Sequence, residues 1–201
     1  MMILRTSTAS PFGRKARIAA AVLGLDKKID VRHADGSDPN DPIRTENPLG
    51  KMPVLTLEDG TYLYDSPVIL EYFDVLAGGG RIIPKETAAR FAALRLQALG
   101  DGLMDASVLL MYEQRFRAED RRESKWIEHQ TAKVSRALAA LEKALPAVSA
   151  SPDVGQITLA CALGYLDFRF AGEWRKQYPK LVQWLDAFAA KVPAYAATTP
   201  A

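Results

Sequence analysis

Cysteine is nearly absent from this sequence, since Cys161 is the only one. A single cysteine cannot form an internal disulfide, and it excludes a Cys-x-x-Cys redox pair. Histidine is also scarce: His33 and His129 are far apart in the chain and lack partners at metal-ligand spacing. We therefore expect no metal site, two histidines at the surface, and a small buried core residue at Cys161, which lies on an apolar helical face.

Long apolar runs and an excess of charge of one sign are missing as well. The longest run, Ile157 to Leu166, includes Thr158 and is too short to cross a bilayer. The first ten residues carry Arg5 and enter a polar turn at once, which is not typical of a signal peptide. The 26 basic and 24 acidic side chains give a formal charge of +2, without the basic excess of a dedicated nucleic-acid binder. We expect a cytoplasmic protein that binds neither nucleic acid nor membrane.

The first eighty residues predict short strands that alternate with helices. The β-α-β part consists of a strand at Met2 to Thr6, a helix at Ala16 to Leu25 and a strand at Ile29 to Arg32. Two strands that flank a helix should be parallel, with a right-handed crossover. Residues 34 to 50 predict a loop with one helical turn. A hairpin around Asp59-Gly60 and a helix from Ser66 to about Leu76 complete this half, and Gly78-Gly79-Gly80 begins a linker.

From about Lys85 onward the pattern predicts helices only. Apolar residues recur at steps of three and four in two long stretches, Leu96 to Leu110 and Ile127 to Leu145. Asp153 and Gln156 resemble a capping box. They open a helix whose predicted buried stripe is Ile157, Cys161, Gly164 and Phe168. The predicted core of a final helix is Leu181, Trp184, Leu185 and Phe188.

Four features stand in the order and approximate spacing found in one family. They are the helical second half and three motifs: Ser10-Pro11-Phe12, Asn47-Pro48-Leu49-Gly50-Lys51-Met52-Pro53-Val54, and Asp65-Ser66-Pro67. The chain resembles the glutathione transferases over essentially its whole length, and within them the short bacterial members with Ser-Pro-Phe at the active-site turn. The second motif followed by Asp-Ser is quite specific, whereas Ser-Pro-Phe alone is weak. The resemblance implies an α+β fold and a homodimer. It places a thioredoxin-like domain with a mixed four-stranded sheet at 1–80 and an all-α helical bundle at 86–201.

The same resemblance implies a site for glutathione as co-substrate. Ser66 at a helix N-cap would offer its hydroxyl and free N–H groups to the γ-glutamyl carboxylate, and Asp65 could hold the amine. The alternative is that both residues only cap a helix. A cis bond before Pro53 would leave the Met52 peptide free to pair with the cysteinyl unit, although most X-Pro bonds are trans. Lys51 could contact the glycyl carboxylate or be a solvated surface lysine. Phe12 completes the implied glutathione site.

Ser10 is the predicted catalytic residue, and Ser7 is the alternative nearer the end of the strand. A free thiol has a pKa near 8.5. Lowering it by roughly two units requires about 2.7 kcal/mol, which a hydroxyl donor and the positive end of a helix can supply. The other interpretation is that Ser10 is only the helix N-cap. Serine in place of cysteine at this turn disfavours thiol transfer, because serine can only assist the thiolate of glutathione.

The expected reaction is therefore attack by the glutathione thiolate on small-molecule electrophiles, with peroxide reduction as a further activity. Met104, Leu110, Met111 and Tyr112 are candidates for the electrophile pocket, because the first helix of the second domain faces the active site in this family. Buried core is the alternative for each of them. The competing hypothesis for the whole protein is a non-catalytic binding or regulatory protein that keeps the fold. A glutaredoxin-like oxidoreductase is disfavoured because the active-site cysteine is missing.

Overall fold

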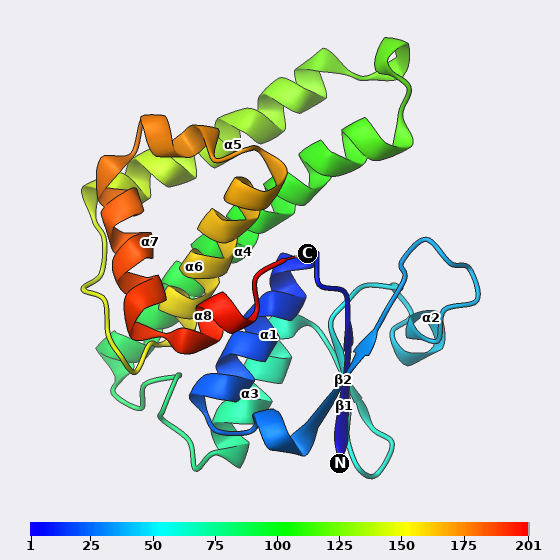
Figure 1. The fold of residues 1–201 in the computed structure, drawn as a ribbon, viewed down its shortest axis with the longest axis vertical. Coiled ribbons are helices and arrows are strands. Elements are labelled where there is room, and N and C mark those ends of the chain that lie inside the picture. The colour runs from blue at the N-terminus through cyan, green and yellow to red at the C-terminus, as the bar shows by residue number, and fades with distance from the viewer. Residues whose placement is uncertain (201) are drawn as a thin grey trace.

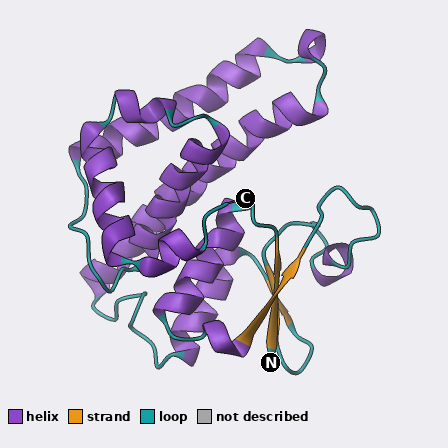
Figure 2. Cartoon of the chain, viewed as in Figure 1, coloured by secondary structure: helices purple, strands orange, loops and turns teal. Residues whose placement is uncertain are grey.

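The computed structural model describes residues 1–200, and its N-terminal part is built on a small sheet. The strands are β1 (Met2–Thr6), β2 (Ile29–His33), β3 (Val54–Thr56) and β4 (Tyr62–Leu63). They lie in the order β2-β1-β3-β4, and Figure 2 shows the strands gathered to one side of the helices. β1 and β2 are parallel, whereas β1 pairs with β3, and β3 with β4, in antiparallel register. This confirms the mixed four-stranded sheet that was predicted.

Helices α1 (Pro11–Val22) and α3 (Ser66–Leu76) lie side by side on one side of the sheet (Figure 1). A short helix η1 (Asp26–Lys28) leads from α1 into β2, and the single turn α2 (Ile43–Glu46) interrupts the loop before β3. The predicted first helix began too late, at Ala16. In the structure it begins at Pro11, because Ser10 caps it and proline suits the first helical position.

The remainder of the chain is helical, as predicted. It comprises α4 (Thr87–Phe116), η2 (Glu119–Arg121), α5 (Ser124–Lys143), α6 (Val154–Arg169), η3 (Glu173–Lys176), α7 (Pro179–Lys191) and α8 (Pro193–Ala197). No helix within residues 1–200 combines the length and the apolar character needed to cross a membrane. Figure 1 shows α4 and α5 as the two long helices of this part.

Helix α6 lies at the centre of the molecule, and its residues from Val154 to Leu166 are all buried. The predicted single stripe was therefore too narrow, and it was wrong at Phe168, which is exposed beyond the end of this buried stretch. Close packing against α4 explains the burial. A Cβ on Gly155 would lie 2.7 Å from the Ala93 carbonyl oxygen, so only glycine allows this approach of the two helices.

The apolar core runs without interruption from the sheet through α1 and α6 to α7. Cys161 lies in this core as predicted, and burial raises the pKa of its thiol to about 12. His33 and His129 are exposed, which confirms that prediction too. Among residues 1–200, no group of three or more His, Cys, Asp or Glu residues is arranged to hold a metal ion.

Two consecutive basic residues join the helical part of the chain to α1. The Arg14 guanidinium donates to the Tyr195 carbonyl oxygen at 2.8 Å and stacks 4.0 Å from the centre of the Tyr195 ring. The fully buried Lys15 ammonium donates to the Asp101 carboxylate on α4 at 2.6 Å. The C-terminal end of the chain accordingly lies beside α1 (Figure 1).

Candidate functional site

Ser10 caps the N-terminus of α1, and its backbone is extended at φ −78° and ψ 119°. The Ser10 Oγ accepts a hydrogen bond from the Gly13 N–H at 3.1 Å, so Ser10 is the N-cap. The hydroxyl oxygen is the acceptor in this bond, which leaves the hydroxyl proton free to be donated. Ser10 can therefore cap the helix and donate a hydrogen bond to a thiolate at the same time.

Ser7 lies at the start of the same turn, directly after β1. Its carbonyl oxygen accepts from the Ser10 N–H at 3.2 Å, and its side chain is half-buried. Gly13 allows the first turn of α1 to press against the end of the strand, since a Cβ there would lie 1.7 Å from the Thr6 Oγ1. Both hydroxyls, Ser7 and Ser10, thus belong to one tight turn, and only Ser10 caps the helix.

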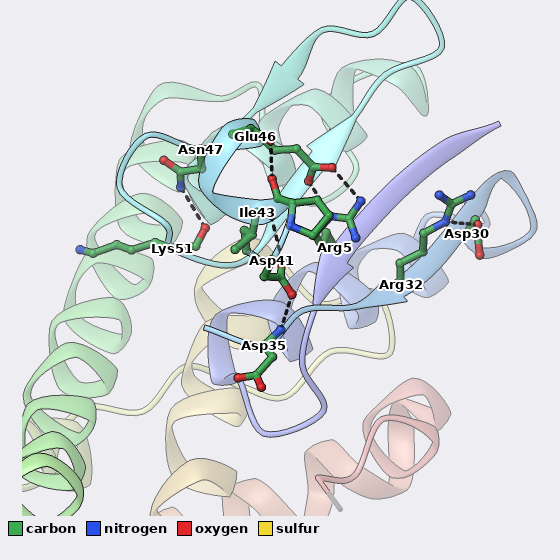
Figure 3. A network of polar contacts seen from close by, with 11 residues as sticks. Arg5, Asp30, Arg32, Asp35, Asp41, Ile43, Glu46, Asn47 and Lys51 are labelled. Carbon is green, nitrogen blue, oxygen red and sulfur yellow. Dashed lines mark hydrogen bonds and ion pairs between the residues drawn. The ribbon is translucent and has the colours of Figure 1, made fainter. Parts of the chain in front are cut away.

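The segment that leads into β3 is held by polar contacts of its own (Figure 3). Arg5 on β1 donates two hydrogen bonds of 2.7 Å to the two carboxylate oxygens of Glu46 in α2. The Asn47 amide donates to the Lys51 carbonyl oxygen at 2.9 Å. Figure 3 shows the Lys51 side chain extending away from this network, and the residue is exposed.

The peptide bond between Met52 and Pro53 is cis, as the family resemblance implied. Met52 precedes β3, which begins at Val54. Within residues 1–200 its N–H and C=O have no hydrogen-bond partner. The chain therefore presents an unpaired peptide unit directly before a sheet strand.

The start of α3 differs from the prediction. Asp65, not Ser66, is the N-cap, because the Asp65 carboxylate accepts a hydrogen bond from the Ser66 N–H and Ser66 is already helical. This confirms a capping role for Asp65 and removes one N–H group from those expected to be free. The Ser66 hydroxyl is buried and has no hydrogen-bond partner among residues 1–200. An unpaired buried hydroxyl is unfavourable, so it points to a missing partner.

Helix α4 contributes charged groups that the sequence analysis did not single out. Asp101 pairs with Lys15, and Asp105 follows one helical turn later. Desolvation is the main cause that raises the pKa of both carboxyls, and the nearby charge of Asp65 raises both further. Lys51 opposes the rise at Asp105. The spacing of these two acids at i and i+4 was the signal available in the sequence, because it puts them on one helix face.

The predicted electrophile pocket is only partly consistent with the structure. Met104 is fully buried and belongs to the core, which is the alternative that the sequence left open for it. Met111 and Leu110 are half-buried, and Tyr112 is exposed, with its ring 5.2 Å from that of Phe116. Phe12 packs partly buried against the core, and its ring centre lies 5.9 Å from the Lys15 ammonium.

Two cavities lie away from the turn at Ser10. One of about 620 Å³ is lined by the last turn of α1, Arg81 and the segment from Lys191 to Ala194. The other, of about 430 Å³, lies within the helical part between α4, α5 and the segment from Phe170 to Tyr178. Neither is lined by Ser10, Met52 or Asp65, so the candidate site is distinct from both.

Similarity to known proteins agrees with this arrangement. The family described as "Glutathione S-transferase, N-terminal domain" matches residues 9–76, and "Glutathione S-transferase, C-terminal domain" matches residues 124–187. A protein of Escherichia coli strain K12, named as the uncharacterized GST-like protein YibF, is 32% identical over 99% of this chain and 98% of its own length. This chain belongs to the glutathione transferase family.

Solved structures of the family superpose on the entire chain. A glutathione S-transferase from Methylobacillus flagellatus, with glutathione bound, is 37% identical with a TM-score of 0.92 and full coverage of both chains. A glutathione transferase family member from Pseudomonas fluorescens, with bound S-(propanoic acid)-glutathione, is 40% identical with a TM-score of 0.89, again with full coverage of both. The fold is therefore that of a thioredoxin-like domain followed by a helical domain, as expected.

Proposed function

We propose that this protein binds glutathione at the N-terminus of α1 and activates its thiol for attack on electrophilic small molecules. The observation that carries the proposal is the Ser10 hydroxyl, whose oxygen accepts from Gly13 while its proton remains free. A donor at the positive end of a 12-residue helix favours the thiolate over the thiol. The relatives solved with glutathione or an S-substituted glutathione support the same ligand here.

Each part of glutathione has a matching group on the protein. The unpaired Met52 peptide would pair with the cysteinyl unit in the manner of an added strand. The unpaired Ser66 hydroxyl would meet the γ-glutamyl carboxylate, and the Asp65 carboxylate would hold the amine. The exposed Lys51 ammonium would hold the glycyl carboxylate. Phe12 is partly buried and packs against the core. We assign it no direct contact with glutathione.

In the proposed reaction the glutathione sulfur forms a bond to an electrophilic carbon. The leaving group departs with the electron pair of the bond that breaks, and the thiol proton goes to solvent. Ser10 donates a hydrogen bond to sulfur while it carries negative charge, and it forms no covalent bond itself. Peroxide reduction is the second activity to assay, since the same thiolate attacks an O–O bond.

Two measurements test the proposal: retention on immobilised glutathione, and conjugation of a chromogenic aryl halide. In Ser10→Ala we expect kcat/KM to fall about 10- to 100-fold, because a hydrogen bond to a charged group is worth about 1.5–3 kcal/mol. Ser7→Ala should stay near wild type, and Ser10→Thr, which keeps the hydroxyl, should retain most activity. The pKa of bound glutathione, followed by thiolate absorbance, should rise in Ser10→Ala only.

The outcomes separate the competing functions. Retention without turnover indicates a binding or regulatory protein, and the absence of both rejects the proposal. Loss of activity in Ser7→Ala with activity kept in Ser10→Ala transfers the role to Ser7. Because alanine also removes a helix cap worth about 1 kcal/mol, the folded fraction of each variant is measured in parallel.

We also propose that the protein is a cytoplasmic homodimer with its domains divided between residues 80 and 86. An exposed apolar face supports the dimer. Val68 and Val75 are seven positions apart on one face of α3, and Phe91 on α4 is 64% exposed. An ion pair of 3.1 Å between Arg90 and Glu71 holds the two helices together beside these side chains. Exposed apolar side chains gathered on neighbouring helices are typical of an interface.

A further inference from the structure

One face of α4 looks toward the N-terminal part of the molecule. Asp101 on this face contacts Lys15 of α1, and Arg115 donates a hydrogen bond to the Ser37 hydroxyl in the loop after β2. At about 100° per residue, the 14 positions between Asp101 and Arg115 end about 40° short of four full turns, so both lie on one face. Asp105 and Tyr112 lie within about 40° of the same direction. Asp105 and Tyr112 therefore lie on the face of α4 between its contact with Lys15 and its contact with Ser37.

Asp105 is the unpaired acid of this face. Asp105 is exposed, and among residues 1–200 its side chain has no hydrogen bond or ion pair. Asp101, by contrast, is already neutralised by the buried Lys15. Asp105 follows Asp101, the partner of Lys15 in α1, by one turn of α4, and the charges of Lys51 and Asp65 act on its carboxyl; it therefore lies on the face of α4 turned toward the proposed glutathione site.

Glutathione would remove the remaining free charges around Asp105. Under the proposed function, the glycyl carboxylate neutralises Lys51 and the amine neutralises Asp65. Lys15 is not available to Asp105, because its ammonium is buried against Asp101. Desolvation raises the pKa of Asp105 from an ordinary value of about 3.9, and because the residue stays exposed to water its carboxyl is still ionised at neutral pH. Once glutathione is bound, the thiolate is the reacting charge, Arg115 lies at the far end of this face beside Ser37, and Asp105 is the free acid of the face that the second substrate meets.

We propose that Asp105 selects the second substrate by charge, so that electrophiles carrying a cationic group are preferred over those carrying an anionic one. This inference rests on the proposed function and names its substrate class. Tyr112, on the same face about two helical turns further on and 49% exposed, supplies an aromatic surface to the same space. A space lined by an aromatic ring and an unpaired carboxylate suits an organic cation such as a substituted ammonium.

The test uses two benzyl bromides of the same shape, one with a para-trimethylammonium group and one with a para-sulfonate group. In both, the glutathione sulfur displaces bromide, and each enzymatic rate is divided by the spontaneous rate with glutathione. We expect wild type to prefer the cation. In Asp105→Asn the cation-to-anion ratio of kcat/KM should fall about tenfold, since each charged substrate changes roughly threefold in opposite directions. Raising the salt concentration should weaken the wild-type preference.

Asp120→Asn is the matched control, because Asp120 is an exposed acid in η2 with no ion pair among residues 1–200. It changes the net charge equally and should leave the ratio unchanged. The ratio staying constant in Asp105→Asn, or wild type preferring the sulfonate, overturns the inference. A higher KM for glutathione in Asp105→Asn, with the same ratio, also overturns it and assigns Asp105 to the glutathione amine.

Binding of the two reaction products by calorimetry separates this inference from the proposed function. If wild type turns over neither bromide but binds the cationic S-benzylglutathione more tightly, and Asp105→Asn loses the difference, the charge selection is supported and catalysis is rejected. If turnover occurs and both products bind equally, the proposed function stands and the role of Asp105 is rejected.

Discussion

The ion pair between Lys15 and Asp101 gives a sharp test of how the two parts of the molecule are held together. The Lys15 side chain is 0% exposed, whereas the Asp101 side chain is 18% exposed. The two partners therefore differ in what happens when the other is removed. An unpaired Lys15 has no access to water, but an unpaired Asp101 can be solvated through its open side.

This asymmetry sets the expected magnitudes. Asp101→Ala leaves a buried ammonium without a carboxylate, and it should lower the free energy of unfolding by about 3–5 kcal/mol. Lys15→Met fills the same space with an apolar chain and should cost about 1–2 kcal/mol. In the double variant no charge is left buried, so adding Lys15→Met to Asp101→Ala should recover about 2 kcal/mol.

The assay is urea unfolding at fixed protein concentration, with thermal melting as a second readout. At this chain length 1 kcal/mol corresponds to about 2–4 °C, so Asp101→Ala should melt roughly 10 °C below wild type. If the double variant is less stable than Asp101→Ala, Lys15 is not the buried, unpaired charge that explains the loss, and the reasoning is refuted.

The same pair predicts a dependence on pH. Desolvation raises the native pKa of Asp101 above its ordinary value of about 3.9, although Lys15 opposes the rise. Between the unfolded and the native pKa the native state binds more protons, so the contribution of Asp101 to stability falls as pH rises through this window. Lys15→Met removes the opposing charge and should steepen the fall, and Asp101→Asn should abolish it. Unfolding followed from pH 4 upward measures the slope.

The remaining predictions concern the turn at Ser10 and the dimer. Gly13→Ala should lower the free energy of unfolding by about 1–3 kcal/mol, because its Cβ would overlap the Thr6 side chain; an unchanged urea midpoint would contradict this close approach. Phe91→Asp should dissociate the proposed homodimer by placing a charge on its apolar face. Sedimentation measures the mass, and a dimer retained in this variant would place the interface elsewhere.

Local pattern was sufficient for most of the fold. The periodicity of Leu181, Trp184, Leu185 and Phe188 predicted the core of α7, and all four are buried. Asp153 was predicted to cap α6, and its carboxylate accepts from the Gln156 N–H at 2.9 Å. These features depend on neighbours within one or two helical turns, which a sequence displays directly.

Two features could not be decided from such local information. At the start of α3, aspartate and serine are both good N-caps, so composition cannot decide between Asp65 and Ser66; the direction of one carboxylate does. Met104 has the same hydrophobicity whether it lines a pocket or the core. Its burial is decided by how α4 is rotated against α6, and that rotation depends on packing along the two helices.

The N-terminal part of α1 shows why long-range contacts were the hardest to predict. Arg14 and Lys15 are the residues that a hydrophobicity pattern assigns to solvent, and both are buried. Their partners, Tyr195 and Asp101, are 181 and 86 positions away in the sequence. No periodicity in the chain connects residues at such separations.

These contacts tie the proposed chemistry to the helical half of the molecule. Ser10 can stabilise a thiolate only while the first turn of α1 keeps its place at the end of β1. Arg14 and Lys15, which belong to the next turn, fix that helix to the C-terminal segment and to α4. The same Lys15 contact sets the position of the α4 face that carries Asp105. One buried ion pair therefore positions both the group proposed to activate the thiol and the charge proposed to select its partner, so the sheet half alone cannot form the complete site.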